Sequence, residues 1–256
     1  MRETLSVILI AHNEEQALGP MLEGLLRAYD REILEVIVVD DASRDRTAEI
    51  AEDWGKRNLK VRLIKRTPPC GVGRALRTGF GNISPKAEYA LSMDSDFVEN
   101  IAQVRALLDA VEKENCDGVI GSRFVKGGKV IGYPFLKLLM NRLFHWVVKI
   151  IFRIKQNDLT NNFKLYRTKI FQSMPWKSDG FAMNAETGLL PILFGYQIVE
   201  VPVVWIDRSP EMGRSKFGLF KHGAGYVQVI FHALRCAWSK KPVTPNSAPA
   251  ITSKQE

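Results

Sequence analysis

Cysteine is scarce in this chain of 256 residues, and the three that occur, Cys70, Cys116 and Cys236, lie far apart with no CxxC spacing. A disulfide framework or a thiolate zinc site is therefore not expected, and a reducing compartment fits best. Long apolar runs are also missing. No uncharged stretch reaches the roughly 20 residues that a membrane-spanning helix needs, and residues 1–4 lead into the first apolar run without a signal-peptide core. We expect a protein that is soluble or lies on a membrane without crossing it.

Two nucleotide-binding signatures are absent as well. No G-x-G-x-x-G follows the first apolar run, which disfavours a dinucleotide-dependent oxidoreductase, and no G-x-x-x-x-G-K-[ST] occurs, which disfavours a P-loop NTPase. Negative charge is in deficit: Lys and Arg number 36 against 28 Asp and Glu, a net charge of +8. This balance suits nucleic acid, an anionic membrane or phosphorylated substrates, and does not choose among them.

Apolar, β-rich runs alternate with amphipathic helical patterns in the first half of the chain. The expected strands are 5–11, 34–39, 61–64, 89–93 and 118–121, and the expected helices are 15–29, a segment through Ile50 and Trp54, a segment through Leu76 toward Phe80, and 103–114. Ser43 and Asp45 are the candidate N-caps of the second helix. The alternation predicts an α/β fold with a mostly parallel sheet that is flanked by helices on both faces.

The most informative residues are Asp94 and Asp96, which follow a short apolar run. Side chains alternate along a strand, so these two carboxylates point the same way at the end of a buried strand. Ligands of open α/β sheets bind at this edge. Two converging carboxylates repel one another unless a cation lies between them, and such oxygen ligands suit Mg²⁺ or Mn²⁺. Acidic residues also follow the first two strands, as Glu14, Asp40 and Asp41.

The second half contains two long amphipathic segments, 133–155 and 217–240, that carry Lys, Arg and Trp beside apolar residues. In the first of them, four basic residues share one helical face: Arg142, His145, Lys149 and Arg153. This composition suits the headgroup level of a bilayer, whereas packing on the core or a dimer interface is the alternative. From Ser239 the chain is rich in Pro, Ser and Lys, which predicts a disordered tail.

Seven motifs appear in an order typical of one enzyme family. They are Asn13-Glu14; residues 38–43 (VVDDAS) with Asp45 and Thr47; Gly71, Gly73 and Gly79; residues 93–96 (MDSD); residues 121–124 (GSRF); residues 158–163 (DLTNNF); and residues 199–202 (VEVP) followed by Asp207, Arg208 and 213–216 (GRSK). Over residues 5–220 the chain resembles family 2 inverting glycosyltransferases of the Rossmann-like GT-A fold, and among them the dolichyl-phosphate mannose synthases. We expect one catalytic domain over 1–238, with a nucleotide-sugar half (1–125) and an acceptor and membrane-interface half (126–238), followed by a disordered tail (239–256).

The resemblance implies a role for each matching residue. The nucleotide-sugar site comprises Ile10, His12, Glu14, Val39, Asp41, Asp94, Ser95, Asp96, Arg123, Glu186, Arg208 and Lys216. Within it, Asp94 and Asp96 hold Mg²⁺ or Mn²⁺, Arg123 and Arg208 face phosphates, and Glu186 faces the sugar. Asp96, Arg123 and Arg208 are the expected catalytic residues, and Lys216 belongs to a mobile lid. Lys137 and Asn141 fall where the family grips the acceptor phosphate.

The chain departs from the family pattern at three places. Ile10 and His12 replace the usual Pro and aromatic residue, and Val98 replaces a third metal contact. Asn161 and Asn162 replace the commoner Ser-Gly. These departures leave the sugar and the lipid less defined than the reaction type.

The resemblance implies transfer of a hexose, with inversion, from a nucleoside diphosphate to a polyprenyl phosphate. Mannose from GDP-mannose is the first choice, and a UDP-sugar donor or a soluble saccharide acceptor is the alternative. A membrane partner subunit or a homo-oligomer is open, no nucleic-acid partner is expected, and the expected location is the cytoplasmic face of the membrane. Remoter alternatives are a phosphatase, because residues 94–98 (DSDFV) also fit an Asp-x-Asp-x-Val loop, and a non-catalytic nucleotide-binding protein.

Overall fold

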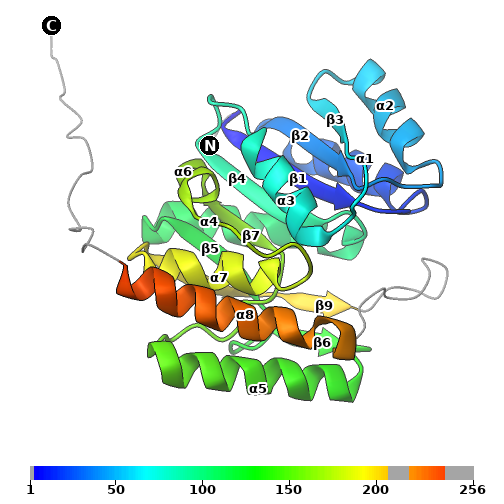
Figure 1. Cartoon of the computed structure of the whole chain (residues 1–256). Coiled ribbons are helices and arrows are strands. Elements are labelled where there is room, and N and C mark those ends of the chain that lie inside the picture. The colour runs from blue at the N-terminus through cyan, green and yellow to red at the C-terminus, as the bar shows by residue number, and fades with distance from the viewer. Residues whose placement is uncertain (1–2, 207–218, 240–256) are drawn as a thin grey trace, which may run out of the picture.

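A computed structural model describes residues 3–206 and 219–239 of the chain (Figure 1). Its centre is a seven-stranded sheet in the order β3-β2-β1-β4-β7-β5-β8. The strands are β1 (Leu5–Ala11), β2 (Ile33–Asp40), β3 (Val61–Lys65), β4 (Tyr89–Asp94), β5 (Gly118–Ser122), β7 (Lys164–Arg167) and β8 (Ile198–Pro202). Only β7 runs antiparallel to its neighbours within this sheet. The predicted mostly parallel α/β sheet is therefore confirmed.

Helices cover both faces of this sheet, because alternate residues of its central strands point to opposite sides. Leu5, Val7 and Leu9 of β1 pack with α1 and α4, whereas Ile8 packs with α3, α6 and α7. The helices are α1 (Leu18–Tyr29), α2 (Thr47–Arg57), α3 (Val72–Gly81), the 3₁₀ helix η1 (Val98–Gln103), α4 (Val104–Glu114), α5 (Phe135–Phe152), α6 (Thr168–Ser173), α7 (Met183–Leu193) and α8 (Leu219–Trp238). A separate pair, β6 (Lys129–Ile131) and β9 (Val204–Ile206), lies near α8 (Figure 1).

The start of α1 and the cap of α2 differ from the sequence predictions for one shared reason. The loops that follow β1 and β2 bind each other: the N–H groups of Asn13, Glu14 and Glu15 donate to the side chains of Ser43, Thr47 and Asp45, respectively. Residues 13–15 are held in this cross-link, so α1 begins only at Leu18. Arg46 occupies the assigned N-cap of α2, whereas Asp45 Oδ1 accepts a hydrogen bond from the N–H of Thr47, the first residue of the helix, at 3.0 Å. The predicted cap was therefore one residue away for Asp45 and wrong for Ser43.

Helices α5 and α8 expose much of their apolar surface. The exposed apolar residues are Phe135, Leu136, Leu139, Met140, Leu143, Trp146, Ile150 and Ile151 on α5, with Val227, Phe231 and Trp238 on α8. The predicted basic face of α5 does not face solvent as a unit. His145 is buried, and Arg142 and Lys149 both donate to Asn157. Within residues 3–206 and 219–239, no helix is long and apolar enough to span a membrane.

Candidate functional site

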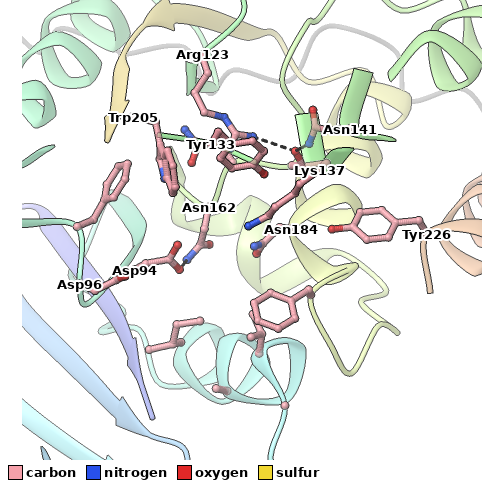
Figure 2. A pocket seen from close by; sticks show the side chains of 18 of the residues that line it. Asp94, Asp96, Arg123, Tyr133, Lys137, Asn141, Asn162, Asn184, Trp205 and Tyr226 are labelled. Atoms are coloured by element: carbon pink, nitrogen blue, oxygen red, sulfur yellow. Dashed lines mark hydrogen bonds between the residues drawn. The ribbon is translucent and has the colours of Figure 1, made fainter. Parts of the chain in front are cut away.

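A cavity of about 650 Å³ begins at the carboxyl ends of β1, β2 and β4 and extends between α5 and α8 (Figure 2). Its walls change character along this path. The strand-end part is acidic, with Glu14, Asp41, Asp94 and Asp96. The middle carries two cations and several hydrogen-bonding groups: Arg123, Tyr133, Lys137, Asn141, Thr160, Asn161, Asn162 and Asn184. The far part is mainly apolar: Met140, Leu143, Phe144, Val147, Phe181, Tyr226, Val227 and Ile230.

The structure brings most of the predicted site residues to this one cavity. Those that line it are Ile10, His12, Glu14, Asp41, Asp94, Ser95, Asp96, Arg123, Lys137 and Asn141. Arg208 and Lys216 lie outside the described residues. Val39 and Glu186 do not belong to the described lining.

The structure places the side chains of Val39 and Glu186 in the interior rather than in the described lining of the cavity. Val39 is fully buried in the core, against α3. Glu186 is also fully buried, and its carboxylate accepts hydrogen bonds from the main-chain N–H groups of Lys177 at 2.7 Å and Ser178 at 2.8 Å. Residues two positions apart on a helix point in nearly opposite directions. Because Asn184 of α7 faces the cavity, Glu186 faces away and orders the 177–178 segment instead.

The side chain of Asp94 is positioned by two polar neighbours. Asn162 Nδ2 donates to Asp94 Oδ1 at 2.8 Å, and Ser92 Oγ donates to Asn162 Oδ1 at 2.7 Å. Ser92 and Asp94 both belong to β4, two residues apart, so they point to the same side of the sheet. Asn162 therefore bridges them and orients the Asp94 carboxylate. This is the arrangement by which outer polar groups hold a metal ligand in place.

The donor set fits a hard divalent cation. Asp94 and Asp96 present carboxylate oxygens to the same cavity, and Mg²⁺ is commonly bound through one or two carboxylates together with substrate phosphates. No group of three or more His, Cys, Asp or Glu suited to a metal occurs in the described part of the chain. The two carboxylates would therefore share the ion with phosphate oxygens and water.

Within the acidic part, the region that follows β2 is built around Asp41. Its Oδ2 accepts a hydrogen bond from the N–H of Gly71 at 2.6 Å, and its Oδ1 pairs with Arg66. His12 Nδ1 donates to the main-chain oxygen of Asp41 at 2.7 Å. A Cβ at Gly71 would collide with the main-chain oxygen of Asp179, so only glycine permits this loop to pack beside the cavity.

Arg123 enters the cavity from a buried ion pair. Its Nε and Nη2 donate to the two carboxylate oxygens of Asp158 at 2.7 and 2.8 Å, and its main-chain N–H donates to the same carboxylate at 3.0 Å. Burial alone would raise the pKa of Asp158, but the Arg123 charge and these hydrogen bonds hold it below its usual value. The guanidinium is thereby fixed in place and charged.

A second cation, Lys137, lies beside the aromatic ring of Tyr133, with Nζ 4.7 Å from the ring centroid. One turn later on α5, Asn141 donates through Nδ2 to Thr160 Oγ1 at 2.7 Å. Thr160 Oγ1 also accepts from Arg123 Nη2 at 3.1 Å. Figure 2 shows Arg123, Lys137 and Asn141 around the middle of the cavity. Two positive charges in this part of the cavity suit an anionic group such as a phosphate.

Lys164 ties together two segments that line the cavity. Its ammonium is fully buried in β7 and donates to the main-chain oxygens of Asn161 and, at 2.9 Å, Asn184. Burial lowers the pKa of Lys164 to about 7, although the negative charges of Asp158 and Asp94 raise it and so limit the decrease. Lys164 therefore holds the loop before β7 and the first turn of α7 in a fixed relation.

His145 connects α5 to the same loop. Leu159 donates its N–H to His145 Nε2 at 2.7 Å, so the ring donates through Nδ1 to the main-chain oxygen of Asn141, also at 2.7 Å. Because Nε2 accepts a hydrogen bond, this pair of contacts requires the neutral ring. The sequence pattern grouped this histidine with the basic residues of one helical face, because neither partner is recognisable without the tertiary structure.

We predict that His145 makes the protein acid-sensitive. Burial lowers the pKa of His145 to about 4 in the folded chain, against about 6.5 when unfolded. Above pH 6.5 the ring is neutral in both states, so its contribution is complete. Between pH 6.5 and 4 only the unfolded chain takes up the proton, which costs about 3 kcal/mol of stability. Urea unfolding at pH 7.5 and 5 checks this. His145→Gln should unfold with a smaller difference between the two pH values, and an unchanged difference would contradict the assignment.

The model of the family described as "Glycosyl transferase family 2" matches residues 6–174. The undecaprenyl-phosphate mannosyltransferase of Micrococcus luteus is 29% identical over 90% of this chain and 94% of its own length. The dolichyl-phosphate hexose transferase of Haloferax volcanii is 29% identical over 89% of this chain and 92% of its own. Among solved structures, glucosyl-3-phosphoglycerate synthase from Mycobacterium tuberculosis in complex with Mn²⁺ and uridine-diphosphate-glucose superposes with a TM-score of 0.67 at 20% identity, covering 94% of this chain and 80% of that one. This last likeness concerns the fold.

Proposed function

Because the chain belongs to glycosyl transferase family 2, we propose that it transfers a hexose from a nucleoside diphosphate to a polyprenyl phosphate. The observation that carries the proposal is the gradient along one cavity. An acidic strand-end part, a cationic middle and an apolar slot between α5 and α8 follow one another. These match, in the same order, a metal-bound sugar nucleotide, an acceptor phosphate and a hydrocarbon chain. The curated relatives whose names include undecaprenyl-phosphate and dolichyl-phosphate support this choice of acceptor.

The chemistry follows from the charge of the acceptor. A phosphate monoester carries between one and two negative charges near neutral pH, so its oxygen attacks without a general base. A bond forms between this oxygen and the anomeric carbon while the bond from that carbon to the donor's β-phosphate oxygen breaks. The nucleoside diphosphate leaves with the electron pair, and attack from the opposite side inverts the anomeric configuration. Catalysis then consists of positioning and charge stabilisation.

Each part of the cavity has a role in this reaction. Asp94 and Asp96 would hold Mg²⁺ or Mn²⁺, which when bound supplies positive charge to the departing diphosphate. Arg123 and Lys137 hold the acceptor phosphate in the middle of the cavity, and Tyr133 lies beside Lys137. Asp41, His12 and Gly71 surround the end where the base and ribose would bind. We include Arg208 and Lys216 as further phosphate contacts, on the resemblance alone.

A donor panel tests the proposal. The chain would be incubated with Mn²⁺, a short polyprenyl phosphate and either GDP-mannose, UDP-glucose or another nucleotide sugar, and sugar extracted into organic solvent would be counted. Mannose from GDP-mannose is our first expectation, because the motif set resembles that group. Transfer from a UDP-sugar would retain the reaction and change the donor. Failure of every donor while nucleotide still binds would reject the proposal in favour of a non-catalytic protein or a soluble saccharide acceptor. Phosphate release without a donor would indicate a phosphatase.

The exposed apolar residues of α5 and α8 lie beside the apolar slot, so we propose that this surface rests on the membrane that contains the acceptor. Exposed cations flank it at Arg142, Arg153, Lys155 and Arg235, which suits anionic headgroups.

We predict that Trp146→Glu with Ile150→Glu reduces binding to anionic vesicles at least ten-fold, because each residue loses about 2 kcal/mol of apolar burial. Trp146 and Ile150 are 62% and 57% exposed, so the fold should tolerate the change. Vesicle sedimentation measures the effect. Leu59, which is 98% exposed and lies between α2 and β3, supplies the control Leu59→Glu. Equal binding by the double variant and the wild type would reject the surface.

A further inference from the structure

The carboxamide of Asn184 is an unexplained polar group in the cavity wall. Asn184 lies in the first turn of α7, is 9% exposed and lines the cavity. Its Oδ1 is buried and has no hydrogen-bond partner among the described residues. Figure 2 shows its amide in the pocket, in the region of Lys137 and Asn162. A buried acceptor left without a donor costs about 1–3 kcal/mol, so such a group points to a ligand that completes it.

The main chain holds Asn184 firmly at this place. Its carbonyl oxygen accepts from the Lys164 ammonium at 2.9 Å and from Thr187 Oγ1 at 3.1 Å. Its N–H donates to the carbonyl oxygen of Phe181 at 3.1 Å. Both main-chain groups are thus satisfied, and the side chain alone is left for a ligand. The residue cannot withdraw from the cavity without breaking the contact with buried Lys164.

The chemistry of the amide oxygen discriminates among the substrate parts. Oδ1 requires a ligand O–H or N–H donor. The diphosphate offers only acceptor oxygens, and the acceptor phosphate, which carries more than one negative charge near neutral pH, offers mainly acceptor oxygens, so neither is a suitable partner for Oδ1. The prenyl chain has no polar hydrogen. The nucleobase end of the cavity is formed by His12, Asp41 and Gly71, at the ends of β1 and β2. A hydroxyl of the transferred sugar, held between the two phosphates, is the remaining donor.

We propose that Asn184 determines sugar specificity by accepting a hydrogen bond from one hydroxyl of the transferred hexose. This inference rests on the proposed function and adds a residue that distinguishes one sugar from another. The predicted sugar contact, Glu186, lies two residues further along α7 and is directed away from the cavity. A site that accepts a substrate hydroxyl discriminates strongly against an analogue that lacks it, because the buried acceptor is then left unpaired.

The test compares the wild type with Asn184→Asp and Asn184→Ala on the best donor of the panel and on its 2-, 3-, 4- and 6-deoxy sugar analogues. We expect the wild type to lose about ten- to one-hundred-fold in kcat/KM on one analogue. Asn184→Ala should lose a similar factor on the parent donor and hardly distinguish it from that analogue. Affinity for the free nucleoside diphosphate should stay within about two-fold. Asn100→Ala is the matched control, since Asn100 is a buried amide outside the described cavity lining.

Asn184→Asp preserves the shape of the side chain and guards against misfolding of the alanine variant. Because it keeps an acceptor oxygen at the same place, it should retain both the wild-type melting temperature and the discrimination against that analogue. Unchanged discrimination in Asn184→Ala would overturn the inference, as would lost discrimination in a folded Asn184→Asp or an equal loss of affinity for the free nucleoside diphosphate. If the wild type transfers no sugar at all, the proposed function fails separately. The inference is then judged by the affinity ratio of GDP-mannose to GDP and of UDP-glucose to UDP, which Asn184→Ala should lower if it is correct and leave unchanged if it is not.

Discussion

Asp96→Ala is expected to lower the rate of sugar transfer by about a thousand-fold or more while leaving the fold intact. Asp96 follows β4 and faces the same cavity as Asp94, so the variant removes one of the two carboxylates proposed to hold the divalent cation. Loss of several kcal/mol of charge stabilisation at the leaving diphosphate corresponds to this factor. Its position after the strand end, in a turn, means that little packing is lost.

The measurement is transfer rate at saturating donor as a function of Mn²⁺ concentration, together with the melting temperature. Asp96→Asn keeps the shape and removes the charge, so it should also be severely impaired. Asp53→Ala serves as the control, because Asp53 is a carboxylate on α2 whose side chain is 42% exposed and pairs with Lys56. Full activity of Asp96→Ala, with an unaltered dependence on Mn²⁺, would refute the site as described.

Asp158→Ala is expected to destabilise the chain by about 3–5 kcal/mol, since it leaves the Arg123 guanidinium buried without a counter-charge. Arg123 and Asp158 are 6% and 0% exposed and are joined by two side-chain hydrogen bonds. Removal of both charges should lower the free energy of unfolding by less than removal of one. The double variant Arg123→Met with Asp158→Leu is therefore expected to recover much of the free energy of unfolding, although transfer stays low because a cation proposed to face phosphate is gone.

Urea denaturation of the two single variants and the double variant measures this coupling. The partly exposed pair of Arg167 and Glu88 provides a comparison, and Glu88→Ala should cost about 0–1 kcal/mol. The pH dependence follows from the lowered pKa of Asp158. Its stabilisation is complete above the unfolded pKa of an aspartate and is lost as the pH falls through the lower folded value. Additive losses in the double variant would show that the two side chains do not stabilise the fold as a pair.

Local sequence patterns and tertiary contacts each determine a different part of this protein. Strand alternation and helical periodicity are local, so β1 was predicted with its exact bounds and Asp94 and Asp96 were placed at a strand end. The ends of parallel strands meet at one edge, and this alone predicted that Glu14, Asp41 and the Asp pair would converge. The antiparallel strand β7 was not predicted, because its four residues carry no pattern distinct from a loop.

The sequence alone therefore determined the α/β class, the family and the acidic end of the cavity, since these follow from local patterns, from motif order and from the rule that parallel strands end at one edge of a sheet. Tertiary structure decided which side chains complete the site. In the sequence, Asn162 stood out only as a departure from the family pattern. In the structure, it precedes β7, which pairs with β4, and its side chain orients Asp94 of β4. Asn184 faces the cavity while Glu186 does not, because packing fixes the rotation of α7. Helix α5 presents Trp146 outward and His145 inward for the same reason. A helical period shows which residues share a face, and only contacts with distant segments decide where that face points.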